Sequence, residues 1–407
     1  MRTQIPSDRY YDQAFAAREW ERMWRRVWML VGHASDVAAD GQWFVHELGH
    51  ESVLVVRDGE RVRAFHNVCP HRGAILCQGE RGHAAGGRFT CPYHDWQFGL
   101  DGALKKAPDA GAIPPEFGHL SELRCEVQAG WVWVSLAADA VPLQEFLGPV
   151  LPRLQVYHAE RYRRVGHLTL EIACNWKASA DVSNEWYHLR AVHPELLGWC
   201  DVDAVAAEEL ERHSHIRVPF GVPSRDAGPW PSPELLEYAR GFGIDPSRVA
   251  SPDALRSELI AATRAIEHRE QLQLGELSDE QLVDKHQYML FPHVQLNHFT
   301  AFHLDLYRHR PFAGDPERMI FDWERFQRVR PGHEEPLVRR KGKPGDFDVG
   351  RVMQADLDLL PRVQRGLHAA SMRTFLTTAR EWTIAHAHSV LERYLGEFEG
   401  EAATWQP

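Results

Sequence analysis

Two short cysteine–histidine pairs constrain this chain more than any other feature of its sequence. The first is Cys69 and His71, with one residue between them, and the second is Cys91 and His94, with two residues between them. Nineteen residues separate the pairs. Two thiolates and two imidazoles at this spacing suit a metal centre held by two loops. The chain must therefore fold so that these loops meet.

The order of the ligands favours an iron–sulfur cluster over zinc. Zinc knuckles usually place two like residues on one turn, whereas each pair here has one cysteine and one histidine. This division allows Cys69 and Cys91 to hold one iron while His71 and His94 hold the other. We predict a Rieske [2Fe–2S] cluster, with a zinc-stabilised binding module as the alternative.

The composition is that of an ordinary globular protein with two domains. Its 407 residues suffice for two cores, and 44% hydrophobic and 25% charged residues are typical values. The net charge of −11 argues against nucleic acid or an anionic membrane as partner. We find neither an apolar leader nor an 18-residue apolar window, and the six cysteines fit a reducing compartment. We expect a cytoplasmic protein. The remaining cysteines are expected to be small buried hydrophobes, namely Cys77, Cys125, Cys174 and Cys200.

Hydrophobic spacing predicts three parts in the chain. Residues 1–40 are expected to be a helical segment, with a helix from Ser7 to about Leu30, that packs on the C-terminal domain. Residues 41–155 are expected to form an all-β domain whose two loops carry the cluster. Asp58-Gly59 and Asp101-Gly102 are the hairpin signals within it. Residues 156–407 form the second domain.

The second domain is predicted to be an antiparallel sheet packed with helices, which gives the whole chain an α+β, helix-grip-like fold. A half-buried strand is expected around Leu168 to Cys174. The later elements are three strand-like runs, Tyr288–Phe299, Phe302–Tyr307 and Met319–Val329, a loop from Pro331 to Gly350, and helices from about Asp348 to Phe375 and from Ala379 to Leu395.

A second group of polar residues follows the Leu168 strand. On a helix, Asp181, Glu185 and His188 would lie on one face at i, i+4 and i+7. Pro194 biases the helix to end just before His193. One histidine alone would be unremarkable in a chain with 24 of them. The set at this spacing indicates two imidazoles that bind one metal.

Two histidines and one carboxylate form the facial triad of non-haem Fe(II) sites, so a remote carboxylate is needed. Asp356 lies in register with Leu360, Val363 and Leu367 on the apolar stripe of a predicted helix. A carboxylate on such a stripe is costly unless it is paired or bound to metal. Asp358 is rotated by about 200° at helical geometry and faces solvent. We therefore favour Asp356 over Asp358.

In these motifs the chain resembles the Rieske non-haem iron oxygenases, the α (oxygenase) subunits of the aromatic ring-hydroxylating dioxygenases and their relatives. Respiratory Rieske proteins have two further cysteines where this chain has Ala74 and Tyr93. The family's catalytic domain shows Asn-Trp-Lys, an acidic residue, acid-x2-His-x4-His, and an Asp eight residues before Gln-x-Gly. The matching residues here are Asn175-Trp176-Lys177, Asp181, Glu185, His188, His193, Asp356 and Gln364-Arg365-Gly366.

The resemblance implies roles for these residues. His188, His193 and Asp356 would bind the mononuclear iron. Residues 41–155 would be a Rieske domain and residues 156–407 a catalytic domain. Glu185 would be the bridging carboxylate that links an iron-ligand histidine to His94 of a neighbouring subunit. The role of Asp181 is less defined, because the family more often has Glu there.

One departure from the family concerns the cluster. The residue after the second histidine is usually Gly in the family, and here it is Asp95. A negative charge beside the cluster should favour the oxidised state and lower the potential. We therefore expect the substitution Asp95→Gly to raise the midpoint potential.

The resemblance also implies an activity. The chain would be the oxygenase component of a multicomponent enzyme that hydroxylates an aromatic or other small substrate with O2. Electrons would come from NAD(P)H through a reductase and possibly a ferredoxin, and the assembly would be a homotrimer or an α3β3 hexamer with a small β subunit. The alternative is a monooxygenase that hydroxylates or demethylates a quaternary amine or methoxy compound, and the last option is an electron-transfer protein.

The substrate pocket is expected within residues 196–300. Weak candidates for its lining are Leu189, Val192 and Phe299. An aromatic cage for a cationic amine could draw on Trp199, Trp230, Tyr238 and Phe242.

Overall fold

The structure is a computed structural model that describes residues 3–333 and 335–397. The chain folds into two compact units. The larger unit comprises Met1–Ala17, Leu147–Tyr157 and Arg161–Pro407, and the smaller unit comprises Arg18–Phe146 and His158–Glu160. The smaller unit begins before the expected boundary at residue 40, because the chain enters its sheet at Trp28, and its main segment ends at Phe146 rather than at residue 155. Within the described residues, no helix has the length and apolar character needed to span a membrane.

The predicted helix from Ser7 to Leu30 is wrong in its second half. The chain forms a 3-10 turn (Ser7–Tyr10), α1 (Gln13–Glu19) and a π-helical turn (Trp20–Trp24), and then β2 (Trp28–His33). Every residue of β2 is buried. A continuous apolar run of this kind is typical of a strand covered on both faces. Pairing with β11 therefore outweighs the helical spacing of Phe15, Trp20, Trp24 and Trp28, on which the predicted helix rested.

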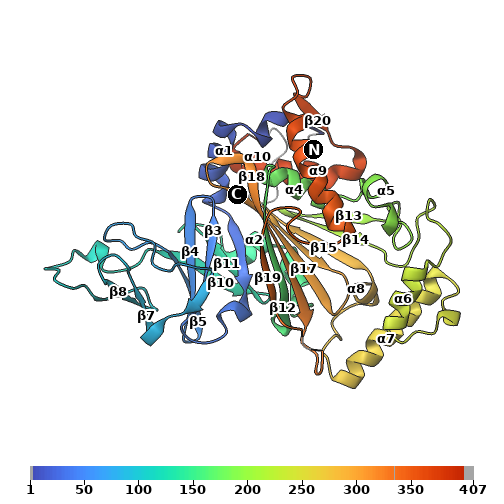
Figure 1. Ribbon diagram of the computed structural model, residues 1–407, viewed down its shortest axis with the longest axis horizontal. Coiled ribbons are helices and arrows are strands. Elements are labelled where there is room, and N and C mark those ends of the chain that lie inside the picture. The colour runs from blue at the N-terminus through green and yellow to red at the C-terminus, as the bar shows by residue number, and fades with distance from the viewer. Residues whose placement is uncertain (1–2, 334, 398–407) are drawn as a thin grey trace. The chain divides into compact units, whose positions relative to one another are not determined.

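The smaller unit is built on a seven-stranded antiparallel sheet (Figure 1). Its order is β2-β11-β10-β5-β4-β3-β6. The strands after β2 are β3 (Gln42–Leu48), β4 (Glu51–Asp58), β5 (Arg61–His66), β6 (Arg81–His83), β10 (Glu122–Gln128) and β11 (Trp131–Ser135). The predicted hairpin at Asp58-Gly59 is confirmed, and Gly59 has the positive φ of 58° that such a turn requires.

A three-stranded sheet completes the smaller unit. It consists of β7 (Arg88–Thr90), β8 (Gln97–Gly99) and β9 (Leu104–Lys106), with the predicted turn at Asp101-Gly102 between β8 and β9. Cys69 lies in the loop between β5 and β6, and Cys91 lies in the loop between β7 and β8. The two sheets thus carry the two loops with the cysteine–histidine pairs.

The larger unit contains an eight-stranded sheet of order β13-β14-β15-β16-β17-β18-β12-β19 (Figure 1). The strands are β12 (Tyr162–Ile172), β13 (Ala206–Leu210), β14 (His213–Val218), β15 (Lys285–Leu290), β16 (Val294–His298), β17 (His303–Phe312), β18 (Asp315–Arg328) and β19 (Val338–Gly342). All pairs are antiparallel except β12 with β19. The predicted α+β class is confirmed.

Two predictions about these strands are wrong. The run Tyr288–Phe299 is two strands, because Pro292 lies in a turn between β15 and β16 and cannot donate a ladder hydrogen bond. The predicted loop Pro331–Gly350 contains β19, an edge strand whose basic residues hid it from the hydrophobic pattern.

Helices alternate with the strands of the larger unit along the chain. They are α3 (Val150–Gln155), α4 (Trp176–Ser183), α5 (Leu189–Val192), α6 (Pro233–Gly241), α7 (Pro252–Glu270), α8 (Asp279–Val283), α9 (Arg351–Leu367) and α10 (Trp382–Leu395), and α2 (Leu143–Leu147) precedes them. Helix α4 packs on β17, β18 and α9. The predicted last helix is confirmed as α10.

Helix α9 ends at Leu367 rather than at Phe375 as predicted. The reason is a two-stranded sheet: β20 (Thr374–Leu376) pairs with β1 (Gln4–Pro6), and Phe375 lies opposite Ile5. This pairing of distant segments ties the N-terminal residues to the larger unit.

Candidate functional site

Three side chains that the sequence selected as metal ligands come together in the larger unit. One ligand atom from each of His188, His193 and Asp356 lies within 4.8 Å of the others. Nε2 of His193 is 2.9 Å from Oδ1 of Asp356, and Nε2 of His188 is 3.9 Å from the same oxygen. The histidines flank α5 and the aspartate comes from α9. Two imidazole nitrogens and a carboxylate oxygen that converge in this way fit a 2-His-1-carboxylate iron site.

The sequence predicted one continuous helix that carries Asp181, Glu185 and His188, and this prediction is wrong. Helix α4 ends at Ser183, and Asn184 has non-helical backbone angles. The buried Asn184 side chain donates to the carbonyl of Thr383 at 3.0 Å and accepts from the hydroxyl of Ser214 at 3.3 Å. These two hydrogen bonds satisfy the buried amide, which would otherwise be costly, and they stabilise the non-helical conformation of Asn184. The turn that follows carries Glu185 and His188.

Glu185 holds His188 in place. Its carboxylate accepts a 2.5 Å hydrogen bond from Nδ1 of His188, and it also accepts from the backbone N–H groups of Tyr187 and His188. With Nδ1 engaged, Nε2 is the nitrogen that faces Asp356. Burial lowers the pKa of His188, but the hydrogen bond and charge of Glu185, with the charge of Asp356, outweigh burial and leave this pKa raised. Glu185 is itself buried.

Asp181 lies apart from the three ligands. Its carboxylate accepts from the hydroxyl of Tyr10 and lies 3.5 Å from Nε2 of His388 on α10. The same hydroxyl lies 2.9 Å from Nε2 of His388. Asp181 therefore joins the N-terminal segment to α4 and α10.

The two aspartates of α9 face different surroundings. Asp356 meets the histidines, whereas Asp358 is exposed and accepts a 2.8 Å hydrogen bond from Gln354. The predicted apolar stripe holds at Leu360 and Leu367, which are buried, but Val363 is 38% exposed. Gln364 anchors the helix: its side chain accepts from the backbone N–H of Asn175 at 2.9 Å.

In the smaller unit, the two cysteine–histidine pairs also meet. The thiols of Cys69 and Cys91 are buried, and the rings of His71 and His94 are 4.7 Å apart. Nδ1 of both histidines is buried with no hydrogen-bond partner among the described residues. Burial is the largest influence on the Cys69 thiol and raises its pKa, so a thiolate there needs a cation. Two buried thiols and two unpartnered imidazole nitrogens fit a [2Fe–2S] group.

Asp95 has the backbone conformation that explains why Gly is usual at this position. Its φ is 54°, in the left-handed region where a Cβ is disfavoured. Its carboxylate accepts from Lys106 at 2.9 Å and from Gln97 at 3.3 Å, and the Lys106 bond is the main cause of its lowered pKa. The charge next to the pair Cys91 and His94 is therefore partly compensated.

A cavity of about 340 Å³ adjoins the three ligands in the larger unit. A second cavity of about 1200 Å³ shares several of its lining residues. The shared residues include Trp186, Leu196, Lys285, Phe299, Asp305 and Trp323. The two cavities therefore adjoin at these side chains, and the smaller one reaches the three ligands.

The predicted pocket residues are partly found here. Leu189 and Phe299 line the smaller cavity, and Trp199, Tyr238 and Phe242 line the larger one. Val192 and Trp230 are not among the described residues that line either cavity. Sequence reasoning missed Lys285, Asp305, Tyr307 and Trp323 as lining residues. The polar alternation of β17, with Asp305 and Tyr307 opposite Leu304 and Leu306, was the available signal.

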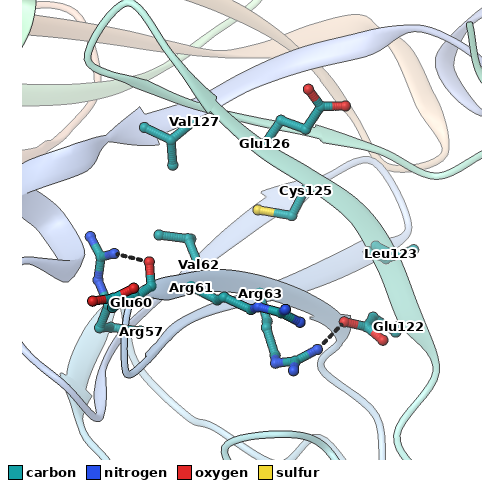
Figure 2. A pocket seen from close by; sticks show the side chains of 10 residues that line it. All are labelled: Arg57, Glu60, Arg61, Val62, Arg63, Glu122, Leu123, Cys125, Glu126 and Val127. Atoms are coloured by element: carbon teal, nitrogen blue, oxygen red, sulfur yellow. Dashed lines mark hydrogen bonds and ion pairs between the residues drawn. The ribbon is translucent and has the colours of Figure 1, made fainter. Parts of the chain in front are cut away.

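A third pocket, of about 440 Å³, lies over β5 and β10 in the smaller unit (Figure 2). Its lining is mostly charged, and Arg63 donates to Glu122 there at 2.8 Å. Cys125 points into it, although its thiol was expected to be a plain core residue. None of the described residues lining this pocket is a predicted metal ligand.

Comparison with known proteins agrees with the two groups of candidate ligands, one in each unit. Residues 27–120 match the Rieske [2Fe-2S] domain, and residues 159–397 match the ring hydroxylating alpha subunit (catalytic domain). The glycine betaine monooxygenase oxygenase subunit of Pseudomonas aeruginosa (strain UCBPP-PA14) is 32% identical over 54% of this chain and 56% of the relative. The chain thus spans about half the length of the curated relatives it matches.

Two solved structures show the same fold. A quaternary ammonium Rieske monooxygenase that oxidises carnitine has a TM-score of 0.72 at 20% identity, with 96% of this chain and 95% of that chain covered. A naphthalene 1,2-dioxygenase has a TM-score of 0.69 at 17% identity, with 97% and 93% covered. The fold is therefore common to enzymes with different substrates.

Proposed function

Because this chain belongs to the ring-hydroxylating alpha subunit family, whose catalytic-domain model matches residues 159–397, we propose that it is the oxygenase component of a Rieske-type non-haem iron oxygenase. The observation that carries this proposal is the convergence of His188, His193 and Asp356 within 4.8 Å beside a cavity. Three protein ligands on one side leave positions open on a bound iron. That iron, when present, would supply O2 activation.

The chain's own residues would position and enclose the reaction. Glu185 fixes the ring of His188 through Nδ1, which sets the direction of the ligand nitrogen. The apolar side chains Leu189, Phe299 and Leu360 line the cavity and exclude water. The substrate would lie in this cavity, close to the three ligands but not among them.

Electrons would arrive from outside the chain. We propose that NAD(P)H reduces a partner reductase, with or without a ferredoxin, and that the partner reduces a [2Fe–2S] cluster held by Cys69, Cys91, His71 and His94. His94 of one subunit would then hydrogen-bond to Glu185 of the next, in a homotrimer or an α3β3 hexamer. Support comes from the solved relative, which is described as transferring electrons between subunits.

For the substrate we propose a small quaternary ammonium compound, oxidised by monooxygenation. The support is the names of the relatives, which act on glycine betaine and carnitine. Hydroxylation of an aromatic ring is the second candidate, and it is favoured by the aromatic side chains Tyr307, Phe321 and Trp323 in the cavity wall.

The test begins with metal analysis of the purified protein. We expect about three irons and two acid-labile sulfides per chain, together with a Rieske EPR signal after reduction. Oxygen uptake is then measured with a reductase and a panel of quaternary ammonium and aromatic compounds. Zinc in a colourless protein would contradict the whole proposal. If the protein contains two irons per chain and this number does not rise on anaerobic addition of Fe(II), the protein is an electron carrier rather than an oxygenase.

A further inference from the structure

Lys285 occupies an unusual place in the larger unit. It is the first residue of β15 and lines both cavities, so it lies where they join. Its Nζ is 4.5 Å from the ring centre of Trp186 and 4.9 Å from that of Phe299. The two aromatic faces hold the ammonium group at this junction through cation–π attraction.

This ammonium group has no anionic partner among the described residues. No carboxylate of residues 3–333 or 335–397 lies within 4.0 Å of Nζ, and no hydrogen bond to it is formed there. Asp305, whose charge acts on Lys285, is occupied: it accepts from Trp323 Nε1 at 2.9 Å and lies 3.6 Å from Arg325. A half-buried cation without a counter-ion is costly, and aromatic faces offset that cost in part.

The lysine keeps its charge near neutral pH. Burial lowers its pKa to about 8, while the charges of Asp305 and Asp356 oppose this effect. The other cation of the ligand-side cavity, Arg351, is 77% exposed and lies 3.6 Å from Glu195. Among the described lining residues of that cavity, Lys285 is thus the half-buried cation available to a ligand.

We propose that Lys285 binds a carboxylate group of the substrate. The inference rests on the proposed oxygenase function and narrows its substrate class to small molecules that carry a carboxylate. A carboxylate at the junction of the cavities would complete the missing ion pair of Lys285. The rest of the molecule then extends into the space lined by Tyr307, Phe321 and the three ligands, where the oxidised carbon lies.

The arrangement also sets what the aromatic residues can do. Trp186 and Phe299 already hold the chain's own ammonium group, so they are not available as a cage for a substrate cation. A quaternary ammonium substrate must therefore place its cationic end deeper, near Tyr307. A zwitterion with its carboxylate at Lys285 satisfies both requirements, whereas a quaternary ammonium alcohol leaves Lys285 without a partner.

The experiment measures ligand binding to the metal-loaded full chain by anaerobic calorimetry. The ligands are two matched pairs, glycine betaine with choline and benzoate with benzyl alcohol, in which the first member of each pair has a carboxylate and the second a hydroxyl group. The variants are Lys285→Met, which keeps the apolar stem, and Lys285→Arg, which keeps the charge. Lys341→Met on the exposed edge strand β19 is the control.

We expect a carboxylate ligand to bind the wild-type protein more tightly than its alcohol. Lys285→Met should weaken binding of the carboxylate ligand by about 10- to 100-fold, which is the usual effect of losing a hydrogen bond to a charged group. The affinity for the matching alcohol should change by less than about threefold. Lys285→Arg should recover part of the loss, and Lys341→Met should change neither ligand. Iron content and circular dichroism establish that each variant is folded.

The outcomes separate this inference from the proposed function. Equal weakening of both members of a pair, or a wild-type protein that does not prefer either carboxylate, overturns the role of Lys285 even if ligand-stimulated oxygen uptake remains. A loss confined to benzoate, with no binding of glycine betaine, supports Lys285 and contradicts a quaternary ammonium substrate. If Lys285→Met does not fold, Lys285→Gln and Lys285→Arg are compared in its place. The proposal then requires Lys285→Gln to lose, and Lys285→Arg to keep in part, the preference for the carboxylate over its alcohol.

Discussion

Nδ1 of His188 donates a 2.5 Å hydrogen bond to the carboxylate of Glu185, three residues earlier in the chain. The bond leaves Nε2 directed at Asp356, so one carboxylate decides which nitrogen of the histidine is offered to a metal. Glu185 also accepts two backbone N–H groups of the same turn. The ligand's orientation is therefore built into the short segment between α4 and α5.

Glu185→Gln is expected to leave both metal centres bound while turnover falls by about 10- to 100-fold, as is typical when a group behind a metal ligand is changed. The amide retains one acceptor oxygen for His188 but loses the negative charge. Its N–H₂ group faces the backbone N–H groups of Tyr187 and His188 and cannot accept their hydrogen bonds. Iron content, the EPR spectrum and oxygen uptake measure the two effects separately. Glu237→Gln, at an exposed position of α6, is the control, and near-normal turnover of Glu185→Gln would refute the positioning role.

Asp356→Ala is expected to remove the mononuclear iron and keep the cluster. The third ligand contributes the only carboxylate of the predicted metal site, and two histidines alone bind Fe(II) weakly. Iron per chain should fall from about three to about two, while the visible spectrum of the cluster is unchanged. Asp358→Ala, two residues away on the exposed face of α9, should retain all the iron. Equal iron loss in both variants would contradict the assignment.

Asp95→Gly is expected to raise the midpoint potential of the cluster. The substitution removes a negative charge beside Cys91 and His94, and it suits the φ of 54° at this position. The potential is measured by a redox titration followed by EPR. An unchanged potential would contradict the electrostatic role of Asp95.

Lys106→Met provides the opposite change to Asp95→Gly. Lys106 donates to the Asp95 carboxylate at 2.9 Å, so its removal leaves the negative charge uncompensated. The midpoint potential should then fall below that of the wild-type protein. A double variant, Asp95→Gly with Lys106→Met, should show little effect of the lysine change, because its partner is gone.

The sequence could single out candidate metal ligands because most of their spacing is local. Cys69 with His71, and His188 with His193, are fixed by short turns, so chemistry and spacing identify them without a fold. Asp356 required one further step, the cost of a carboxylate on an apolar stripe. The α+β class followed from the change of hydrophobic period along the chain.

What the sequence did not predict depends on contacts between distant segments. The helix break at Asn184 is held by Thr383 and Ser214, and β20 exists because Phe375 lies opposite Ile5. The cavity wall likewise combines β15, β17 and α9, so Lys285 has no local signal of its role. Propensity and periodicity describe neighbours in sequence and carry no information about such partners.

Asp305→Asn is expected to change how stability depends on pH. Burial raises the pKa of Asp305 to about 6, despite the opposing influence of Arg325 and Trp323. A carboxyl whose pKa is higher in the folded than in the unfolded state, where it is about 3.9, stabilises the fold below the unfolded value and loses this contribution as pH rises through the folded value. Between pH 5 and pH 8 the wild-type protein should therefore lose about 1 kcal/mol of unfolding free energy relative to Asp305→Asn. Denaturant unfolding at several pH values, with equal metal content, measures this difference, and a constant offset between the two proteins across that range would contradict a raised pKa at Asp305.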